Sequence, residues 1–462
     1  MFTLKEAYWK PLIGNTDWLL TPIYFLFFIM LFMFIRNMLY QDDKLMRKYF
    51  MQGLTLKMFG AIGVGLVYFL YYNGGDTNEF FNNATVMYGA FGENTKDFFT
   101  LLFSGNDYNL PTNEEYMPWM YFRNDDSSYM IGKIAGVFSL FTFDTYLPIA
   151  LFFAVVSFTG IWAMFVTLVD VFPKLKTQFA IATLYIPSVF FWGSGVMKDS
   201  ITLACVGWIT WGSYNIFIKQ QKIFSSIIML SIATYLCAIV KPYIILSFAP
   251  SLVFWIFLTY RDRVKLQFLR ILIGPGVIII SAIAGYIVVS RLGRDFEQYS
   301  LQGALKTATN FQGYHTFLAE TSNASGYSLG EMDGSTFGIV KNIPAAINVT
   351  LFRPYPWETR NPVMLLSALE SFALLIFTIR IFYRTGIGRT FKAIGNNATV
   401  FFCIFFSMFF GFCVGFTAYN FGALVRYKIP CIPFFVAGLF ILNYITEQEN
   451  VKRLAEKNDF NY

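Results

Sequence analysis

Four clusters of charged and aromatic residues interrupt the long apolar stretches of this chain, and their side chains are the types that handle protons and phosphates. The clusters are Gly74-Gly75-Asp76-Thr77, Lys198-Asp199, Arg353-Pro-Tyr-Pro-Trp357-Glu358 and Arg426-Tyr-Lys428. Charged side chains are costly in hydrocarbon and are uncommon in membrane segments without a purpose. Charges gathered between apolar stretches therefore predict a site at one face of a membrane.

Asp76 directly follows an apolar stretch, in the sequence Tyr71-Tyr-Asn-Gly-Gly-Asp-Thr77. Gly74 and Gly75 permit positive φ angles and hence a sharp exit from a helix, which would place the carboxylate at the membrane surface. A carboxylate there can act as a general base on a hydroxyl, or hold a divalent cation such as Mg²⁺ or Mn²⁺ on a phosphate. The alternative is an Asx turn that only closes the helix.

Lys198 and Lys241 stand in short turns that are predicted to face the outer side, where the usual charge distribution of membrane proteins does not call for cations. Each ammonium group either contacts a phosphate or reaches the lipid headgroups while its aliphatic stem lies in the apolar layer. Asp199, which follows Lys198, is a predicted N-cap of the next helix. Both interpretations of the two lysines stay open.

The densest cluster runs from Arg353 to Glu358. Its two prolines favour an extended backbone, with Arg353 on one side and Trp357 and Glu358 on the other. Arginine binds phosphate through two parallel hydrogen bonds, and a tryptophan can pack on a sugar ring or anchor a helix at the interface. The alternative is an interfacial aromatic belt that contains a loose Arg353–Glu358 pair.

Arg426 and Lys428 precede the last apolar stretch, again on the predicted outer side, and their alternative role is that of interfacial anchors. A convergence of the cationic side chains would create a pocket suited to a phosphate or pyrophosphate headgroup. The cations that we expect to converge are Lys198, Lys241, Arg353, Arg426 and Lys428.

Glu370, His315 and the five cysteines are the other residues whose types could do chemistry. Glu370 lies inside an apolar stretch, where a carboxylate is either functional or held structurally by a partner such as an outer arginine. His315 is the only histidine, and it has no metal-ligand pattern around it, so we expect an exposed loop residue. The five cysteines lie in or next to apolar stretches without metal-ligand spacing, which predicts a packing role.

The elements that position these residues are transmembrane helices. The chain has 462 residues, of which 56% are hydrophobic and only 14% charged, so it is an all-α polytopic membrane protein. A spanning helix needs roughly 20 mostly apolar residues, and the first stretch lacks the cleavage site of a signal peptide. About eleven stretches qualify: 18–39, 54–72, 146–169, 179–197, 200–218, 224–240, 243–260, 271–290, 363–383, 398–418 and 429–446.

The net charge of +7 comes from Lys and Arg in every second connection between these stretches. The positive-inside rule then predicts an outer N-terminus and a cytoplasmic C-terminus, with no need for a nucleic-acid partner. We expect one integral membrane domain, 1–462, with two long extracytoplasmic loops at 73–145 and 291–362. Aromatic residues recur in both loops and predict packing on the membrane surface rather than disorder. The segment 130–143 is predicted to be an in-plane or re-entrant helix.

With these residues the chain resembles bacterial membrane glycosyltransferases of the GT-C type, which use polyprenyl-phosphate-linked sugar donors. Asp76 looks like the catalytic acidic residue of that class, which lies early in the first extracytoplasmic loop. The stretch Arg426-Tyr-Lys-Ile-Pro430 looks like the Arg-Tyr/Phe-x-x-Pro stretch near the end of many such proteins. The chain departs from the pattern in three ways: Asp76 has no directly adjacent acidic partner, its loop follows the second span, and no soluble C-terminal domain is present.

The resemblance implies sugar transfer from a polyprenyl-phosphate carrier to a glycan or lipid acceptor at the outer side of a bacterial inner membrane. Asp76 would be the base; Lys198, Arg353 and Arg426 would neutralise the carrier phosphate, with Lys241 and Lys428 beside them. Trp357 and Glu358 would shape the sugar pocket. The alternatives are an O-antigen-type polymerase or ligase, a transporter of lipid-linked glycans, and a structural subunit of an envelope complex.

Overall fold

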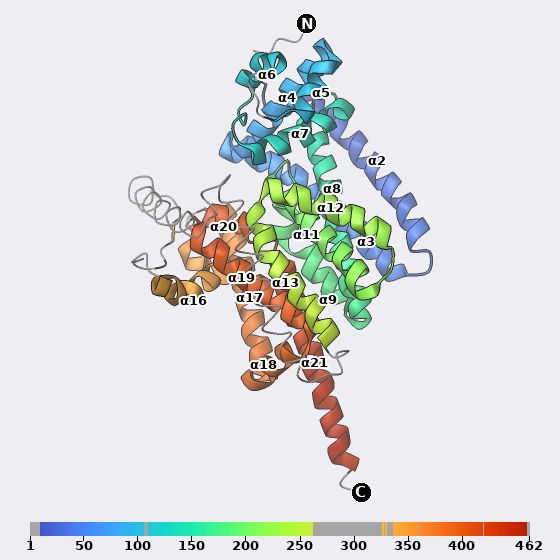
Figure 1. The fold of residues 1–462 in the computed structure, drawn as a ribbon, viewed down its shortest axis with the longest axis vertical. Coiled ribbons are helices and arrows are strands. Elements are labelled where there is room, and N and C mark those ends of the chain that lie inside the picture. The colour runs from blue at the N-terminus through green and yellow to red at the C-terminus, as the bar shows by residue number, and fades with distance from the viewer. Residues whose placement is uncertain are drawn as a thin grey trace. The chain divides into compact units, whose positions relative to one another are not determined.

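The computed structural model describes residues 10–105, 110–261, 326–327, 329, 336–359, 361–418 and 420–459, and these residues form helices and no strands (Figure 1). Eight of the described helices are long and apolar enough to cross a membrane, or nine if one pair bent by 63° counts as a single span. The all-α membrane fold predicted from the composition is therefore confirmed at this level.

The eight helices include two that continue into π-helical turns at their C-terminal ends. They are α2 (Asn15–Leu39), α3 (Lys44–Val67) with η1 (Tyr68–Tyr72), α8 (Tyr146–Val171), α11 (Lys198–Ser213) with η5 (Tyr214–Lys219), α12 (Ile223–Val240), α13 (Pro242–Arg261), α17 (Pro362–Thr385) and α19 (Ala398–Thr417). The bent pair consists of α20 (Phe421–Tyr427) and the first part of α21 (Ile432–Asp459).

Nine of the eleven predicted spans correspond to these helices, and the span predicted at 271–290 lies outside the described residues. The span predicted at 179–197 is not one helix. It is divided into α9 (Lys176–Ala180), η4 (Ile181–Tyr185) and α10 (Pro187–Phe191), followed by turns. Ile186 has an extended backbone because the following proline disfavours a helical conformation there, and proline supplies no N–H for a helix hydrogen bond.

The chain divides into two compact units. The first unit consists of Met1–Val166, Val189–Trp211 and Ile227–Pro242. The second unit consists of Thr167–Ser188, Gly212–Ser226 and Tyr243–Tyr462. Each unit thus combines segments that are distant in sequence, so residues from separate parts of the chain meet within each one.

In the first unit, the predicted loop 73–145 is largely helical. Its helices are α4 (Asp76–Glu93), α5 (Thr95–Phe103), α6 (Pro111–Tyr116), η2 (Met117–Trp119) and α7 (Asp126–Thr142). They enclose a cluster of buried side chains that includes Met87, Phe98, Leu101, Tyr116 and Tyr129. The aromatic residues of this segment thus pack among its own helices, and 130–142 is helical as predicted. Packing of the segment on a membrane surface stays a prediction.

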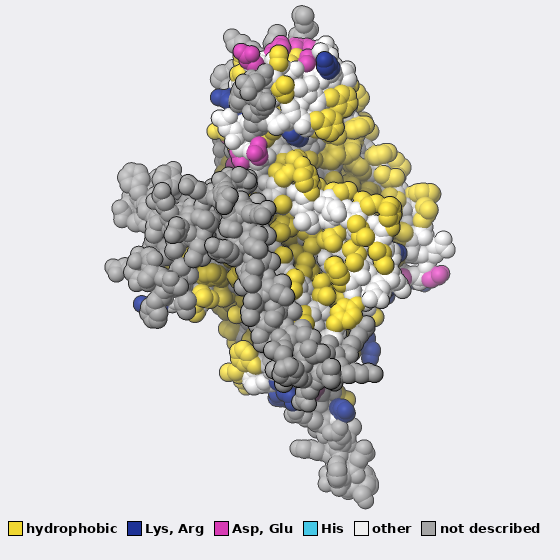
Figure 2. Space-filling view, in the orientation of Figure 1, with side chains coloured by type: hydrophobic (Ala, Val, Ile, Leu, Met, Phe, Trp, Pro, Cys, Tyr) yellow, Lys and Arg dark blue, Asp and Glu magenta, His cyan; other side chains and the backbone are white. Residues whose placement is uncertain are grey.

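Charge and hydrophobicity are separated on the surface of the first unit. Figure 2 shows acidic side chains at the end formed by the helices of 73–145 and hydrophobic side chains along α2 and across α12. Trp18, Leu19 and Phe34 on α2 and Ile228 and Ile232 on α12 are all exposed. Helices that are apolar on their outer faces suit contact with lipid, where backbone groups must be satisfied within the helix itself.

Glycines bring α8 and α11 of the first unit into backbone contact. A Cβ atom added at Gly160 would lie 2.3 Å from the Ala204 Cα, and one added at Gly207 would lie 1.9 Å from the Gly160 carbonyl oxygen. Small residues allow membrane helices to approach this closely. This contact positions the start of α11, which carries Lys198.

Gly207→Ala is expected to lower the free energy of unfolding by at least about 1–3 kcal/mol, because the added methyl group overpacks a backbone contact. Thermal unfolding of the purified protein in detergent measures the change. Gly395→Ala is the matched control, since a Cβ there, in α18 (Ile387–Asn396), meets nothing within 4 Å. Equal stability of the two variants would contradict the close approach of α8 and α11.

In the second unit, the end of the predicted loop 291–362 is a helix, α16 (Thr336–Phe352), which lies against α19. The Thr350 hydroxyl donates a hydrogen bond to the Gly411 carbonyl (2.6 Å), and a Cβ at Gly415 would lie 2.1 Å from the Ala346 carbonyl oxygen. α13, α19 and α21 share an aromatic core that includes Phe248, Trp255, Phe402, Phe406 and Phe434. The remaining short helices of this unit are η3 (Pro173–Leu175) and η7 (Pro356–Glu358).

Candidate functional site

Asp76 is the first residue of α4 and follows the end of the α3 span after a tight turn. Within the turn, Asn73 is left-handed, and Gly74 and Gly75 have φ angles of 143° and 116°. The positive φ angles predicted for the two glycines are confirmed, and they are strained for a residue with a Cβ atom. The turn leaves the Asp76 side chain partly exposed at the start of an 18-residue helix.

Thr77 ties this helix start to two other elements of the first unit. Its hydroxyl shares a 2.8 Å hydrogen bond with the Tyr146 hydroxyl, at the start of α8, and donates to the Val196 carbonyl at 3.1 Å. Both interactions are buried, and buried hydrogen bonds are expensive to lose. They hold Asp76 beside the turn that leads into α11.

Lys198 begins α11 and lies in this same region. Its ammonium donates to Asp125 Oδ2 at 3.0 Å and to the Ser127 hydroxyl at 2.5 Å, and it also interacts with the charges of Asp76 and Lys241. Partial burial raises the pKa of Asp125, but the Ser128 hydroxyl and the Lys198 ammonium outweigh it and hold this pKa below its usual value. Asp125 therefore stays ionised and holds the Lys198 ammonium in place.

Lys241 follows α12 and donates to Asp199 Oδ1 at 2.5 Å. The two side chains are only 7% and 4% exposed. Asp199 thus lies in the first turn of α11 and pairs with Lys241, which differs from the predicted N-cap role. The structure brings Asp76, Lys198 and Lys241 together in one unit, with Lys198 the more accessible cation; a contact of Lys241 with a phosphate stays a prediction.

Glu79 is a site residue that the sequence analysis missed. It lies one helical turn from Asp76 on α4. Burial, and next the charge of Asp76, raise the pKa of Glu79, and a hydrogen bond with Tyr121 offsets part of this rise. A second carboxyl group beside a candidate base can take part in the same proton transfer. The Asp-x-x-Glu spacing after two glycines was the signal that could have identified it.

The possible divalent cation finds no supporting ligand cluster here. Within the described ranges, no group of three or more His, Cys, Asp or Glu side chains is arranged to hold a metal ion. Asp76 and Glu79 supply two carboxylates, fewer ligands than a protein-only cation site requires. The Mg²⁺ or Mn²⁺ role of Asp76 stays a prediction. His315 lies outside the described residues, whereas four of the five cysteines are buried, in agreement with packing.

The Arg353–Glu358 pair in the second unit is tight rather than loose. Arg353 Nε lies 3.0 Å from both carboxylate oxygens of Glu358, and Nη2 donates as well. The Tyr355 backbone N–H donates to the same carboxylate at 2.7 Å. Partial burial raises the pKa of Glu358, but Arg353 and this N–H outweigh it and hold the pKa below its usual value. The pair closes the Arg-Pro-Tyr-Pro-Trp-Glu segment on itself.

Trp357 presents an accessible aromatic face. Its side chain is 72% exposed, and it stacks on Tyr355 with ring centroids 5.0 Å apart. Phe372 contacts it edge-on. The exposed face can pack on a sugar ring or lie at the lipid interface, so both predicted roles of Trp357 remain.

Lys428 and Arg426 belong to the same unit as Arg353. Lys428 is buried and donates to the Ser371 hydroxyl at 2.7 Å, and this hydroxyl lies 3.4 Å from the Arg353 carbonyl oxygen. The Arg353 guanidinium lies over the ring of Phe421, 5.2 Å from its centroid, and Phe421 shares α20 with Arg426. The second unit therefore holds Arg353, Trp357, Glu358 and Lys428 near the first half of α17, and Arg426 lies on α20, which carries Phe421.

Glu370 is held by Ser188 and not by an outer arginine. Its carboxylate accepts hydrogen bonds from the Ser188 backbone N–H (2.7 Å) and hydroxyl (2.6 Å), directly after the break at Pro187. It also interacts with the charge of Lys428. Breaks in membrane helices free backbone groups that the protein must satisfy. This arrangement gives Glu370 a structural role.

Lys57, on α3, is a buried charge that was not predicted from the sequence. It donates to the Ser157 hydroxyl (3.0 Å) and to the carbonyls of Val189 (2.9 Å) and Gly193 (2.7 Å). These three bonds use all the donors of an ammonium group. Lys57 therefore supports the broken backbone that precedes Lys198.

The predicted site residues fall into two groups, one in each unit. Asp76, Lys198 and Lys241 belong to the first, and the other five belong to the second. The convergence of all five cations on one pocket stays a prediction.

No protein-family model, curated protein or solved structure matches the chain. The resemblance to GT-C-type glycosyltransferases thus rests only on the residues quoted above. The proposed function is therefore based on the geometry around Asp76.

Proposed function

We propose that this protein is an integral membrane glycosyltransferase that moves a sugar from a polyprenyl-phosphate carrier to a hydroxyl group of a glycan or lipid acceptor. One observation carries the proposal: a partly exposed carboxylate, Asp76, lies with Lys198 and with a second carboxyl group, Glu79, at the ends of transmembrane helices. A base and a cation for the leaving phosphate are the two groups that such a transfer requires.

In the proposed reaction, Asp76 takes the proton from the acceptor hydroxyl, whose oxygen forms a bond to the anomeric carbon of the donor sugar. The bond between that carbon and the carrier phosphate oxygen breaks, and the phosphate leaves with the electron pair. The Lys198 ammonium stabilises the negative charge that develops, which is where most of the rate enhancement should arise. The predicted roles of Arg353 and Arg426 at phosphate, and of Trp357 and Glu358 at sugar, belong to the same proposal.

The outer side of a bacterial inner membrane is the proposed location of the reaction. Asp76 follows the end of α3, Lys198 begins α11 and Lys241 follows the end of α12. The buried Lys241–Asp199 pair places the ends of α11 and α12 together, and basic residues mark the opposite ends. The positive-inside rule assigns those basic ends to the cytoplasm and supports an outer N-terminus and cytoplasmic C-terminus.

The alternatives make different demands on the spans. A transporter needs polar groups along a path through the membrane. Two charged groups within the spans, Lys57 and Glu370, hold backbone segments through direct hydrogen bonds. This favours a one-sided enzyme, of which an O-antigen-type polymerase or ligase is a variant that transfers a whole glycan instead of one sugar.

Deletion of the gene should cause the polyprenyl-linked sugar donor to accumulate and should remove a defined sugar or repeat from the surface glycan. Mass spectrometry of extracted lipid-linked glycans and of surface polysaccharide measures both changes, with the complemented strain as control. Accumulation of the complete lipid-linked glycan on the cytoplasmic side would instead identify a transporter. An altered envelope with unchanged lipid-linked glycans would identify a structural subunit.

A further inference from the structure

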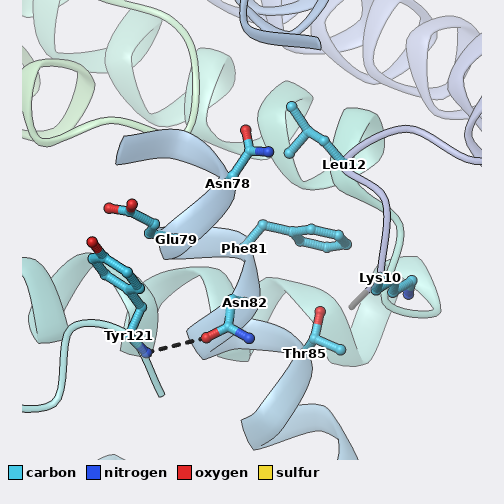
Figure 3. Close-up of a pocket in the computed structure, with 8 residues that line it drawn as sticks. All are labelled: Lys10, Leu12, Asn78, Glu79, Phe81, Asn82, Thr85 and Tyr121. Atoms are coloured by element: carbon cyan, nitrogen blue, oxygen red, sulfur yellow. Dashed lines mark hydrogen bonds between the residues drawn. The ribbon is translucent and has the colours of Figure 1, made fainter. Parts of the chain in front are cut away.

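A cavity of about 210 Å³ opens along α4, beginning one turn beyond Asp76 (Figure 3). Glu79, Phe81 and Asn82 on α4 form one wall, while Lys10 and Tyr121 come from segments on either side. The cavity is smaller than the roughly 300–1,000 Å³ of pockets for drug-sized ligands. Its size suits a single ring with short substituents.

The charges around the cavity disfavour an anion. Lys10 is the cation in the wall, but its ammonium binds Asp144 Oδ2 at 2.5 Å and lies over the Phe81 ring. The other ionisable group in the wall is Glu79, and Asp76 adds a second carboxylate nearby. A phosphate would therefore meet the Glu79 carboxyl group and a lysine that already binds Asp144, whereas a neutral ligand would not be repelled.

Two amide side chains in the wall each have one buried atom without a hydrogen-bond partner among the described residues. Asn82 Oδ1 accepts from the Tyr121 backbone N–H at 3.2 Å, but Asn82 Nδ2 is buried without a partner among the described residues. The same holds for Asn78 Oδ1. One unsatisfied donor and one unsatisfied acceptor cost free energy until a partner arrives. A hydroxyl group, which donates and accepts, can serve both after a small rotation of the amides.

Tyr121 adds an aromatic surface to this polar wall. Tyr121 is 56% exposed and lines the cavity, and its backbone N–H donates to Asn82 on α4. Aromatic rings pack well against the apolar C–H face of a sugar ring, while carboxyl and amide groups bind its hydroxyls. The size, the charge and the lining of the cavity thus all suit a neutral sugar ring.

We infer that this cavity is a saccharide subsite that holds the terminal pyranose ring of the acceptor. The bound ring lies within one helical turn of the Asp76 carboxylate, so one of its hydroxyl groups can face that base. The assignment to the acceptor rests on the proposed glycosyltransferase function, whereas sugar binding in the cavity does not.

Saturation-transfer-difference NMR on the full chain in detergent tests the inference, with glucose, galactose and N-acetylglucosamine as probes. At least one sugar should show ring-proton signals with the wild type and with Asp76→Asn. Tyr121→Ala should weaken binding about tenfold, because an aromatic contact of this kind contributes roughly that factor. Phe103→Ala is the matched control: Phe103 is an exposed aromatic residue of α5 that does not line the cavity.

Absence of binding for all three sugars, or equal binding by wild type and Tyr121→Ala, would overturn the subsite. Measuring the KM for the acceptor distinguishes a wrong subsite from a wrong proposed function. Sugar transfer with an acceptor KM that Tyr121→Ala leaves unchanged would refute the subsite and keep the enzyme. Sugar binding that depends on Tyr121, without any transfer from a polyprenyl-phosphate donor, would keep the subsite and refute the enzyme.

Discussion

Asp76→Asn is expected to reduce sugar transfer by about 10²–10⁴-fold, the usual contribution of a general base. The amide keeps the size of the side chain and its place at the start of α4, but it cannot accept the acceptor proton. The side chain is partly exposed, and the positions of Thr77 and Gly75 do not depend on its charge. The variant should therefore fold and insert normally.

Transfer is measured with the purified variant, a polyprenyl-phosphate-linked sugar and acceptor glycan, and in cells by loss of the sugar from the surface glycan. Glu114→Gln is the matched control, because it makes the same change at an exposed position of α6. Thermal unfolding should be the same for wild type and both variants. Full activity of Asp76→Asn would show that Asp76 is not the base. The transport and scaffolding functions would then be favoured over sugar transfer by this residue.

Lys241→Met is expected to lower the free energy of unfolding by about 3–5 kcal/mol, the usual cost of breaking a buried ion pair by removing one partner. The pair with Asp199 is almost inaccessible to solvent, at 7% and 4% exposure. The substitution leaves the Asp199 carboxylate buried without its cation. Chemical or thermal unfolding in one detergent provides the comparison with the wild type.

Lys198→Met is the matched control for this prediction. Lys198 and its partner Asp125 are 24% and 51% exposed, so this pair should contribute no more than about 1 kcal/mol. The double variant Lys241→Met with Asp199→Leu should recover most of the lost stability, since apolar replacements of buried ion pairs are often neutral. Stability losses of equal size at Lys241 and Lys198 would contradict the buried pair.

The double variant also decides the role of Lys241. If it is stable and still transfers sugar, Lys241 acts through the position of α11, and its predicted phosphate contact is wrong. If it is stable but inactive while Lys198→Met retains activity, the carrier phosphate depends on Lys241 instead. Both results require only the transfer assay with two purified variants, the double variant and Lys198→Met.

The sequence by itself determined the all-α membrane class and most of the spans. A helix in lipid satisfies its own backbone hydrogen bonds, so a long apolar stretch specifies it without reference to the rest of the chain. The positive φ angles of Gly74 and Gly75 also follow from the local sequence, because glycine has no Cβ atom. They determine the position of Asp76 directly after α3. Glu79 could also have been predicted from the sequence, because residues three apart lie on the same face of a helix.

Only the tertiary structure decided which charges are accessible and which are paired. Lys241 meets a carboxylate 42 residues away, and Glu370 meets Ser188 across 182 residues. The sequence marked these charges as exceptional but did not supply their partners, because a partner depends on which helices pack together. Tertiary packing likewise converted the polar stretch 73–145 into a helical segment with a buried core and formed the cavity beside Asp76. Local pattern specifies a helix, whereas the pairing of charges between helices is a property of the packed chain.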